Sequence, residues 1–136
     1  MLKELQFLNP SRLYDPSQNG YTHIVLAPPG STTVYVAGQG GENENGELAP
    51  DFESQLKQAF ANLGIALAAA GARPEHVVKK TTLVVEHNEF KLQQLSAAVK
   101  AMWGEQTPAQ TLIPVPRLAL DGMLFEVDAV AVIPHS

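Results

Sequence analysis

Cysteine is absent from the 136 residues of this chain. Its absence excludes disulfides, thiolate zinc sites, iron–sulfur clusters and a cysteine nucleophile. The sequence also lacks any apolar run near the roughly 18 residues that span a membrane, and its N-terminus lacks the apolar stretch of a signal peptide. We therefore expect a cytoplasmic protein with no membrane partner.

Positive charge is scarce as well. Nine Lys and Arg residues stand against 14 Asp and Glu residues, which gives a net charge of −5. The only basic cluster is the pair Lys79 and Lys80, so we expect no nucleic-acid partner. A hydrophobic content of 45% with 17% charged residues excludes a disordered chain, and the length predicts a single domain over residues 1–136.

Apolar residues that recur at helical spacing predict two one-sided helices, over Asp51–Ala72 and Glu89–Trp103. Pro50 and the acidic Asp51 suit the start of the first helix, and Asn88 is the expected N-cap of the second. Gly64 lies inside the first helix, where a glycine indicates a close backbone approach. Each helix is expected to cover one flat surface.

Runs rich in β-branched residues predict the strands that form this surface. A turn at Pro28-Pro29-Gly30 joins the first two long runs, and Pro114 assigns its strand to an edge or an end of the sheet. With a short strand near Leu5–Leu8, the expected order is β-β-β-α-β-α-β-β, an α+β fold with no repeat and no linker. The long runs are Tyr21–Ala27, Thr33–Gln39, Val77–Glu86, Thr111–Val115 and Leu124–Ile133.

Few residues carry recognisable chemistry. The four histidines form no HExxH motif or local ligand pair, and no serine has a G-x-S-x-G context, so we expect neither a metal site nor a serine triad. The glycine-rich stretch from Gly38 to Gly41 does not lead directly into a helix, which argues against a dinucleotide site. We expect no cofactor.

Two carboxylates in the last strand are of more interest. Glu126 and Asp128 are two residues apart, so in a strand they project from the same face, roughly 6–7 Å from each other. Such a pair is found at the polar end of a half-exposed strand, or at a cleft where a carboxylate orients water or moves a proton. The spacing alone leaves both interpretations open.

Six stretches, in order and at matching spacing, together resemble the RidA/YjgF family, also called L-PSP endoribonuclease-like. They resemble that family's Ser-Gly-Gln turn, its TGE loop, its first helix ending in AAG, its VVKTT strand, its PARS segment and its closing EIEAIA strand. In this chain they are Val34–Gln39, Gly46–Leu48, Asp51–Gly71, Val77–Thr82, Pro108–Thr111 and Glu126–Ala131. The resemblance covers roughly Gly20 to Ile133.

The resemblance implies a chorismate-mutase-like fold, a mixed β-sheet with two helices on one face. It also implies a homotrimer with small-molecule ligand clefts between subunits. An uncovered second sheet face independently favours association, because each apolar layer needs a partner.

Typical members of the family are enamine/imine deaminases that release ammonia and a 2-keto acid. In that pattern an arginine of the PARS segment binds the substrate carboxylate, a glutamate of the closing strand orients the attacking water, and a tyrosine lines the cleft. By position, Glu126 matches the catalytic glutamate and Tyr21 the tyrosine, while Gly38 and Thr111 lie in matching segments.

This chain departs from the pattern at ligand-binding positions. Gln110 replaces the arginine, Leu112 replaces a cysteine or similar small residue, Ala37 replaces serine and Gln94 replaces asparagine. Glutamine cannot form the charged, two-pronged contact of arginine with a carboxylate. The candidate substrate-binding residues are thus Gln110, Tyr21, Ala37, Gly38, Gln94 and Thr111.

Two hypotheses follow from this combination. In the first, the protein is a deaminase-like hydrolase with an altered substrate class, in which Glu126 positions water and Gln110 binds a polar group. In the second, the trimer binds a small metabolite without turnover. A third, RNA cleavage, is disfavoured by the net charge of −5.

Overall fold

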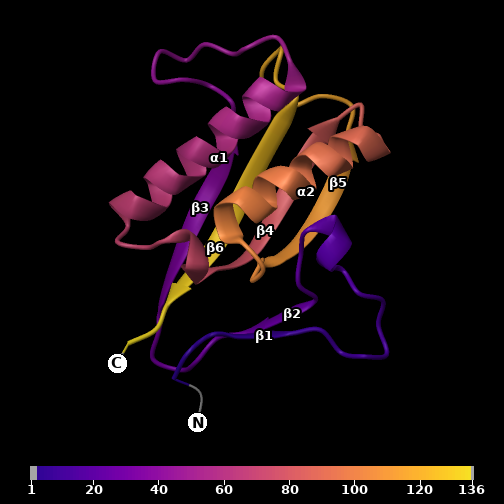
Figure 1. Cartoon of the computed structure of the whole chain (residues 1–136). Helices are drawn as coiled ribbons and strands as arrows, with labels where there is room; N and C mark the ends of the chain where they lie inside the picture. Colours follow the sequence, from indigo (N-terminus) through magenta and orange to yellow (C-terminus); the bar gives the residue numbers. More distant parts are fainter. Residues whose placement is uncertain (1–2, 136) are drawn as a thin grey trace.

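The computed structural model describes residues 3–135, in which two α-helices pack on one face of a four-stranded sheet (Figure 1). A separate two-stranded ribbon and two short 3₁₀ turns complete this part of the chain. The order β-β-β-α-β-α-β-β and the α+β class are confirmed. The elements are β1 (Gln6–Leu8), η1 (Ser17–Asn19), β2 (Ile24–Leu26), β3 (Thr32–Gly40), α1 (Phe52–Ala69), η2 (Pro74–His76), β4 (Val77–Val85), α2 (Glu89–Trp103), β5 (Ala109–Val115) and β6 (Phe125–Ile133).

Both helices begin at the capping residues that the sequence predicts. The Asp51 carboxylate accepts a hydrogen bond from the Ser54 backbone N–H at 3.0 Å, and the Asn88 side chain accepts one from the Lys91 N–H at 2.8 Å. Each bond satisfies a backbone donor that the first helical turn leaves free. α1 ends three residues earlier than expected, at Ala69, and the chain then turns at Gly71.

The sheet is mixed, with strand order β3-β6-β4-β5. β6 pairs antiparallel with β3 and with β4, whereas β4 and β5 run parallel. The sheet order makes β5 an edge strand, which confirms the prediction from Pro114. A proline is tolerated there because it has no N–H to donate to a further strand.

The prediction for Tyr21–Ala27 is only partly correct. The turn before β3 is present, with Gly30 at φ +73°, but β2 covers only Ile24–Leu26 and pairs with β1 rather than with the main sheet. Thr22 forms a single bridge to Ala109 at the start of β5. β3 pairs with β6 and forms the other edge of the main sheet, and among the described residues β2 leaves the free side of β3 unpaired.

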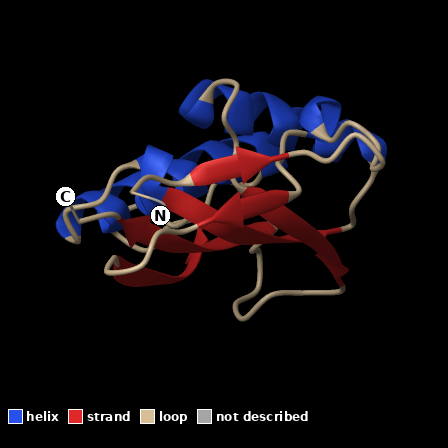
Figure 2. Ribbon diagram, turned by 90° about the horizontal axis from the view of Figure 1, so that it is seen from below, coloured by secondary structure: helices blue, strands red, loops and turns tan. Residues whose placement is uncertain are grey.

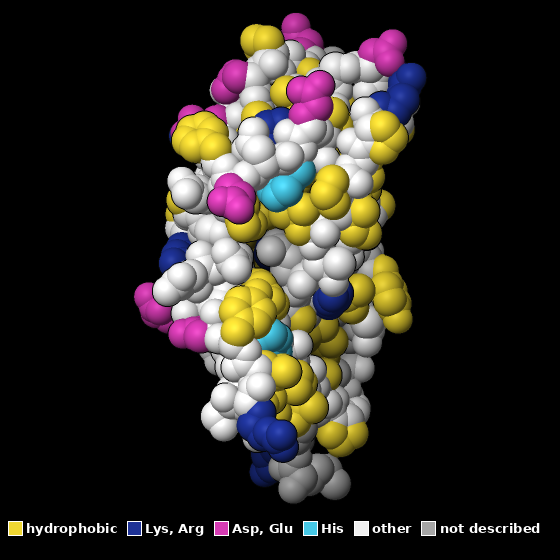
Figure 3. Space-filling model, turned by 90° about the vertical axis from the view of Figure 1, so that its right-hand side faces the viewer, with side chains coloured by type: hydrophobic (Ala, Val, Ile, Leu, Met, Phe, Trp, Pro, Cys, Tyr) yellow, Lys and Arg dark blue, Asp and Glu magenta, His cyan; other side chains and the backbone are white. Residues whose placement is uncertain are grey.

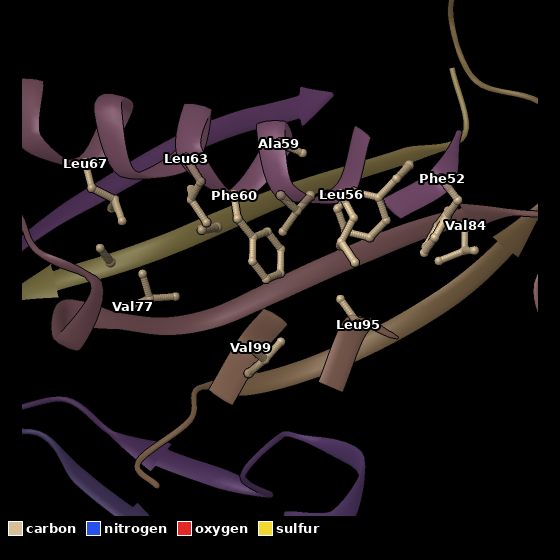
Figure 4. Close-up of a cluster of buried hydrophobic side chains, with 14 of the residues drawn as sticks. Phe52, Leu56, Ala59, Phe60, Leu63, Leu67, Val77, Val84, Leu95 and Val99 are labelled. Atoms are coloured by element: carbon tan, nitrogen blue, oxygen red, sulfur yellow. The ribbon is translucent and has the colours of Figure 1, made fainter. Parts of the chain in front are cut away.

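The core lies between the helices and the sheet, as Figure 4 shows. The Phe125 ring packs edge-on against Phe52 and Phe60, with both centroid distances 5.9 Å. Burying each large aliphatic side chain contributes roughly 1.5–3 kcal/mol. Leucines and valines from both the helix layer and the sheet are fully buried: Leu56, Leu63, Leu67, Val77, Val84, Leu95, Val99 and Val127.

The opposite face of the sheet carries no helix, which Figure 2 shows from below. Tyr35 on β3 is 80% exposed there and Ile113 on β5 is 43% exposed. Within residues 3–135 no helix is long and apolar enough to cross a membrane.

Candidate functional site

Glu126 lies on the uncovered face of the sheet. Along β6, Phe125 and Val127 are fully buried under the helices, whereas Glu126 is partly exposed and Asp128 is exposed. The alternation confirms that the two carboxylates share a face. Asp128 also accepts a hydrogen bond from the Thr81 backbone N–H at 3.1 Å, which ties it to β4.

A β-bulge in β3 lies beside the Glu126 side chain. Val36 pairs with Ala129 and Gln39 pairs with Val127. Two residues of β3, Ala37 and Gly38, therefore lie opposite one residue of β6, Asp128. A bulge bends a strand and changes the direction of its side chains, and bulges are common beside functional sites.

Gly38 is the residue that Glu126 needs at this bulge. A Cβ atom on Gly38 would lie 1.8 Å from Oε1 of Glu126 and 2.6 Å from its Cδ. The carboxylate therefore rests directly on the Gly38 backbone, in space that any other side chain would fill. The structure brings together Ala37, Gly38 and Glu126, three of the residues singled out in the sequence.

The surroundings of Glu126 favour its protonated form. Partial burial raises the pKa of this carboxyl group, and the nearby carboxylates of Glu42 and Asp128 raise it further. Among residues 3–135 no basic side chain forms an ion pair with it. A carboxyl group whose pKa is raised in this way is better suited than an ordinary one to exchange protons with water or substrate.

Two residues of α1, which the sequence did not single out, hold the loop that carries Glu42. The Asn62 amide donates to the carbonyl oxygens of Gly40 and Glu42, at 2.9 and 2.8 Å. Gln55 is 1% exposed, and its amide donates to the carbonyls of Ala49 and Gly122. Polar residues on the buried side of a helix were the available signal for these roles.

Gln110 lies on the other side of the sheet, toward the helices. Its Oε1 accepts a hydrogen bond from Nζ of Lys80, which is fully buried. Nζ of Lys80 also lies 5.9 Å from the ring centroid of Phe60 and 5.6 Å from that of Trp103. Burial lowers the pKa of Lys80 to about 7. The signal that sequence reasoning missed was a lysine at a strand position that alternation directs toward the helices.

Tyr21 belongs to an aromatic cluster in the N-terminal segment. Its hydroxyl group shares a hydrogen bond with that of Tyr14, and its ring packs edge-on against His23 at a centroid distance of 5.5 Å. Burial and the Tyr14 contact raise the pKa of Tyr21 to about 12, so its hydroxyl stays protonated. The neighbouring bridge of Thr22 to Ala109 puts Tyr21 at the same edge of the sheet as Gln110.

The last two predicted binding residues lie apart from each other. Thr111 is exposed on the uncovered face, where its hydroxyl contacts Nζ of Lys79 at 2.8 Å. Gln94 lines a groove of about 620 Å³ between α1 and α2, on the outer side of the helix layer. Within one chain the candidate residues thus occupy three surfaces, and Glu126 and Gln110 point to opposite faces of the sheet.

No cluster of metal-binding side chains is found in the part of the chain that is described, and Figure 3 shows how basic side chains are distributed on one face. Residues 3–135 contain no group of three or more His, Asp or Glu side chains close enough to hold a metal ion. On the face that includes the β5 edge, basic side chains are scattered rather than gathered into a patch (Figure 3).

Comparison with known proteins identifies the fold and the family. The family model described as Endoribonuclease L-PSP matches residues 14–133. The crystal structure of YyfB from Yersinia pestis, a protein of unknown function of the conserved Rid family, superposes with a TM-score of 0.89. It is 35% identical in sequence, and the match covers 96% of this chain and 99% of that one. The chain belongs to the RidA/YjgF family.

Curated RidA/YjgF relatives include proteins with a named activity. A 2-iminobutanoate/2-iminopropanoate deaminase of Rattus norvegicus is 35% identical over 114 residues, covering 82% of this chain and 79% of the relative. A RutC family protein of Synechocystis is 35% identical over 124 residues, covering 79% of this chain and 90% of that protein. The resemblance seen in the sequence and the expected YjgF/RidA fold are confirmed.

Proposed function

We propose that this protein is a hydrolase of the enamine/imine deaminase type, with Glu126 as the catalytic residue. The observation that carries the proposal is the Glu126 carboxylate, which rests on Gly38 at a β-bulge and whose pKa is raised by burial and by two neighbouring carboxylates. The rat relative, named as an imino-acid deaminase, supports the same chemistry.

The proposed reaction needs only water as co-reactant. Glu126 accepts a proton from water as the water oxygen bonds to the imine carbon. That proton passes to the nitrogen and gives a carbinolamine. The proton of its hydroxyl group then moves to the nitrogen as the carbon–nitrogen bond breaks, and a carbonyl compound and ammonia leave. The enamine form of a substrate first takes up a proton on carbon and becomes the imine.

Ammonia release tests the assignment directly. Imines generated by an amino-acid oxidase are the substrate, and we expect Glu126→Ala to lower the rate of their hydrolysis about 100-fold or more. Glu53→Gln, on the exposed side of α1, is the matched control and should leave the rate unchanged. Equal rates in wild type and Glu126→Ala would refute a catalytic role for Glu126.

We also propose that the site is completed in a homotrimer. Glu126 and Gln110 point to opposite faces of one sheet, so one pocket can contain both only if they come from different copies of the chain. The uncovered sheet face, with exposed Tyr35 and Ile113, supports such packing. Native mass spectrometry should give three times the 14.6 kDa of one chain.

Subunit complementation tests this shared site. Trimers assembled from Glu126→Ala chains and Gln110→Leu chains contain some sites with both wild-type residues. We expect such mixed trimers to regain part of the activity that each variant lacks alone. If mixing restores nothing, the two residues do not share an inter-subunit site.

The alternative function is binding of a small metabolite without turnover. The observation that favours it is Gln110 in place of the family's arginine, because this exchange removes a charged contact to substrate. Binding of keto acids without consumption of the corresponding imines, in wild-type protein, would support this alternative over the hydrolase.

A further inference from the structure

Lys80 is a cation buried without an acidic partner. The residue is 0% exposed and ranks among the largest fully buried side chains of the core. In the described part of the chain no carboxylate lies within 4.0 Å of its Nζ. Lysine is almost never fully buried unless it is paired, because removing a charge from water is costly. Such a residue calls for an explanation.

The strand register accounts for its one polar contact. β4 and β5 are parallel, and Lys80 lies directly opposite Gln110 in their pairing. Lysine can only donate hydrogen bonds, so the amide of Gln110 must present its oxygen to Nζ. The Nε2 group of Gln110 then points away from Lys80 with two N–H donors, and within residues 3–135 it donates to no other group.

Gln110 is the member of this pair that a ligand can reach. It is partly exposed and lies on the edge strand of the sheet, whereas Lys80 lies behind it on β4. A second polar group is buried on the same face of β4. The Thr82 hydroxyl is 0% exposed and has no hydrogen-bond partner among the described residues.

We propose that Lys80 and Gln110 together form an anion-binding pair that takes the carboxylate of the ligand. Gln110 contacts the carboxylate through its Nε2 hydrogens. Lys80 acts through Gln110, since its ammonium group fixes the orientation of the amide and supplies the positive charge. This inference rests on the site of the proposed function and names the ligand class of that site.

Compared with the family pattern, the positive charge of this chain lies on β4 instead of on the neighbouring strand β5. The family pattern has an arginine at the position of Gln110 and one lysine in the VVKTT strand, whereas this chain has two lysines there, Lys79 and Lys80. Arginine on β5 and lysine on β4, directly opposite in register, provide the same charge at the same edge of the sheet.

The arrangement predicts that binding depends on pH. Burial alone lowers the pKa of Lys80, to about 7, so the site loses its charge above neutral pH. A bound carboxylate favours the charged lysine, and by linkage the protonated site binds the carboxylate more tightly. The groups that face Lys80 are uncharged: Gln110, Phe60, Trp103 and Ala129.

Charged side chains on the packed elements lie elsewhere. Most are solvent-exposed or lie on the uncovered face of the sheet: Glu53 and Lys57 of α1, Glu89 and Lys100 of α2, Lys79 of β4, and Glu126 and Asp128 of β6. Lys91 of α2 is partly buried, but its Nζ donates to the carbonyls of Val85 and Glu86 at the far end of β4. Glu126, which the proposed trimer places in the same pocket, also has a raised pKa, so the loss of pH dependence in Lys80→Met is the result that assigns it to Lys80.

Calorimetric titration with 2-oxobutanoate and with its uncharged amide, between about pH 6 and pH 9, tests the pair. We expect wild type to bind the keto acid at least about tenfold more tightly at the lower pH than at the higher one. Its affinity for the amide should be the same at both pH values. Lys80→Met should lose the pH dependence and bind the keto acid about tenfold more weakly at low pH, with amide binding unchanged.

A double variant keeps the test decisive if Lys80→Met does not fold. Lys80→Thr/Gln110→Arg restores the family pattern, and because arginine stays charged, keto-acid binding should be tight at both pH values. Carboxylate binding by Lys80→Met that matches wild type at every pH would overturn the inference, as would a wild type that binds no keto acid.

The result also separates this inference from the proposed function. pH-dependent binding of the keto acid that persists in a Glu126→Gln variant with wild-type ammonia release would sustain the anion pair and reject the catalytic role. If ammonia release requires Glu126 but is unchanged in Lys80→Met at all pH values, the catalytic role is supported and the anion pair is rejected.

Discussion

The two faces of the sheet hold their polar groups in opposite ways. On the uncovered face, the carboxylates of Asp128 and Glu42 lie close enough to Glu126 to raise its pKa, while solvent still reaches the group. On the face under the helices, the single cation Lys80 is enclosed by Phe60 and Trp103.

The two polar side chains are therefore held in place in different ways, Glu126 by the backbone and Lys80 by the packing of the core. Glu126 is held in place by a glycine and a bulge, so its site depends on local backbone shape. Lys80 is held by the layer above it and by one neighbouring strand, so its site depends on the whole core. Substitutions on the two faces should therefore differ in whether they affect stability or chemistry.

The largest contrast is expected from alanine at two nearby glycines. A Cβ on Gly41 would lie 2.6 Å from Cα of Gln55, which is helix backbone and cannot move alone, whereas a Cβ on Gly38 would meet only the flexible end of Glu126. We expect Gly41→Ala to lower the free energy of unfolding by about 3 kcal/mol or more and Gly38→Ala by under about 1 kcal/mol.

Denaturant unfolding combined with the ammonia assay checks this contrast. Gly38→Ala should nevertheless lose most of the activity, because the added methyl group displaces the Glu126 carboxylate. A stable and fully active Gly38→Ala protein would show that the position of the carboxylate on the bulge is unimportant.

Gln55 joins α1 to the segments that precede α1 and β6, and its loss should be nearly as costly. Its amide donates to the carbonyls of Ala49 and Gly122, and its oxygen accepts from the Leu124 N–H at 2.8 Å. Gln55→Leu leaves these buried backbone groups without partners, and we expect a loss of about 3 kcal/mol in urea unfolding. Gln58→Leu, on a more exposed turn of α1, is the control and should cost under about 0.5 kcal/mol.

Lys80 should make the stability of the protein rise with pH. Its pKa falls from 10.5 in the unfolded chain to about 7 in the fold, so between these values the unfolded state binds one more proton. The free energy of unfolding then gains up to about 1.4 kcal/mol per pH unit, or roughly 2 kcal/mol from pH 7 to 9.

The variant Lys80→Met isolates this contribution. It lacks the titrating group, so it should be more stable than wild type near pH 6, and the difference should shrink as the pH rises toward 9. Parallel unfolding curves of the two proteins over this range would mean that Lys80 keeps an ordinary pKa in the folded state.

The smallest effect is expected in the groove outside the helix layer. A Cβ on Gly64 would meet only Cε of Met102, at an ordinary 3.8 Å, so the close backbone approach predicted from this glycine is wrong. Gly64→Ala should raise the free energy of unfolding by about 1 kcal/mol through helix propensity, without changing activity. A decrease on thermal unfolding would indicate a packing requirement at this position.

Short-range patterns were enough for much of this protein. The helix starts at Asp51 and Asn88, the strand over Val77–Val85 and the common face of Glu126 and Asp128 all follow from capping or from alternation between neighbours. These features depend on residues a few positions apart, which a sequence displays directly.

The sequence by itself therefore determined the order of elements, the two-helix layer and the family, together with Gly38 and Glu126 as candidate site residues. Only the tertiary structure decided that β2 pairs with β1, that Lys80 is buried against Gln110, and that Gln110 and Glu126 face opposite sides. The physical reason is that strand pairing and coverage by a helix join distant segments, and no local pattern specifies which partner a strand takes.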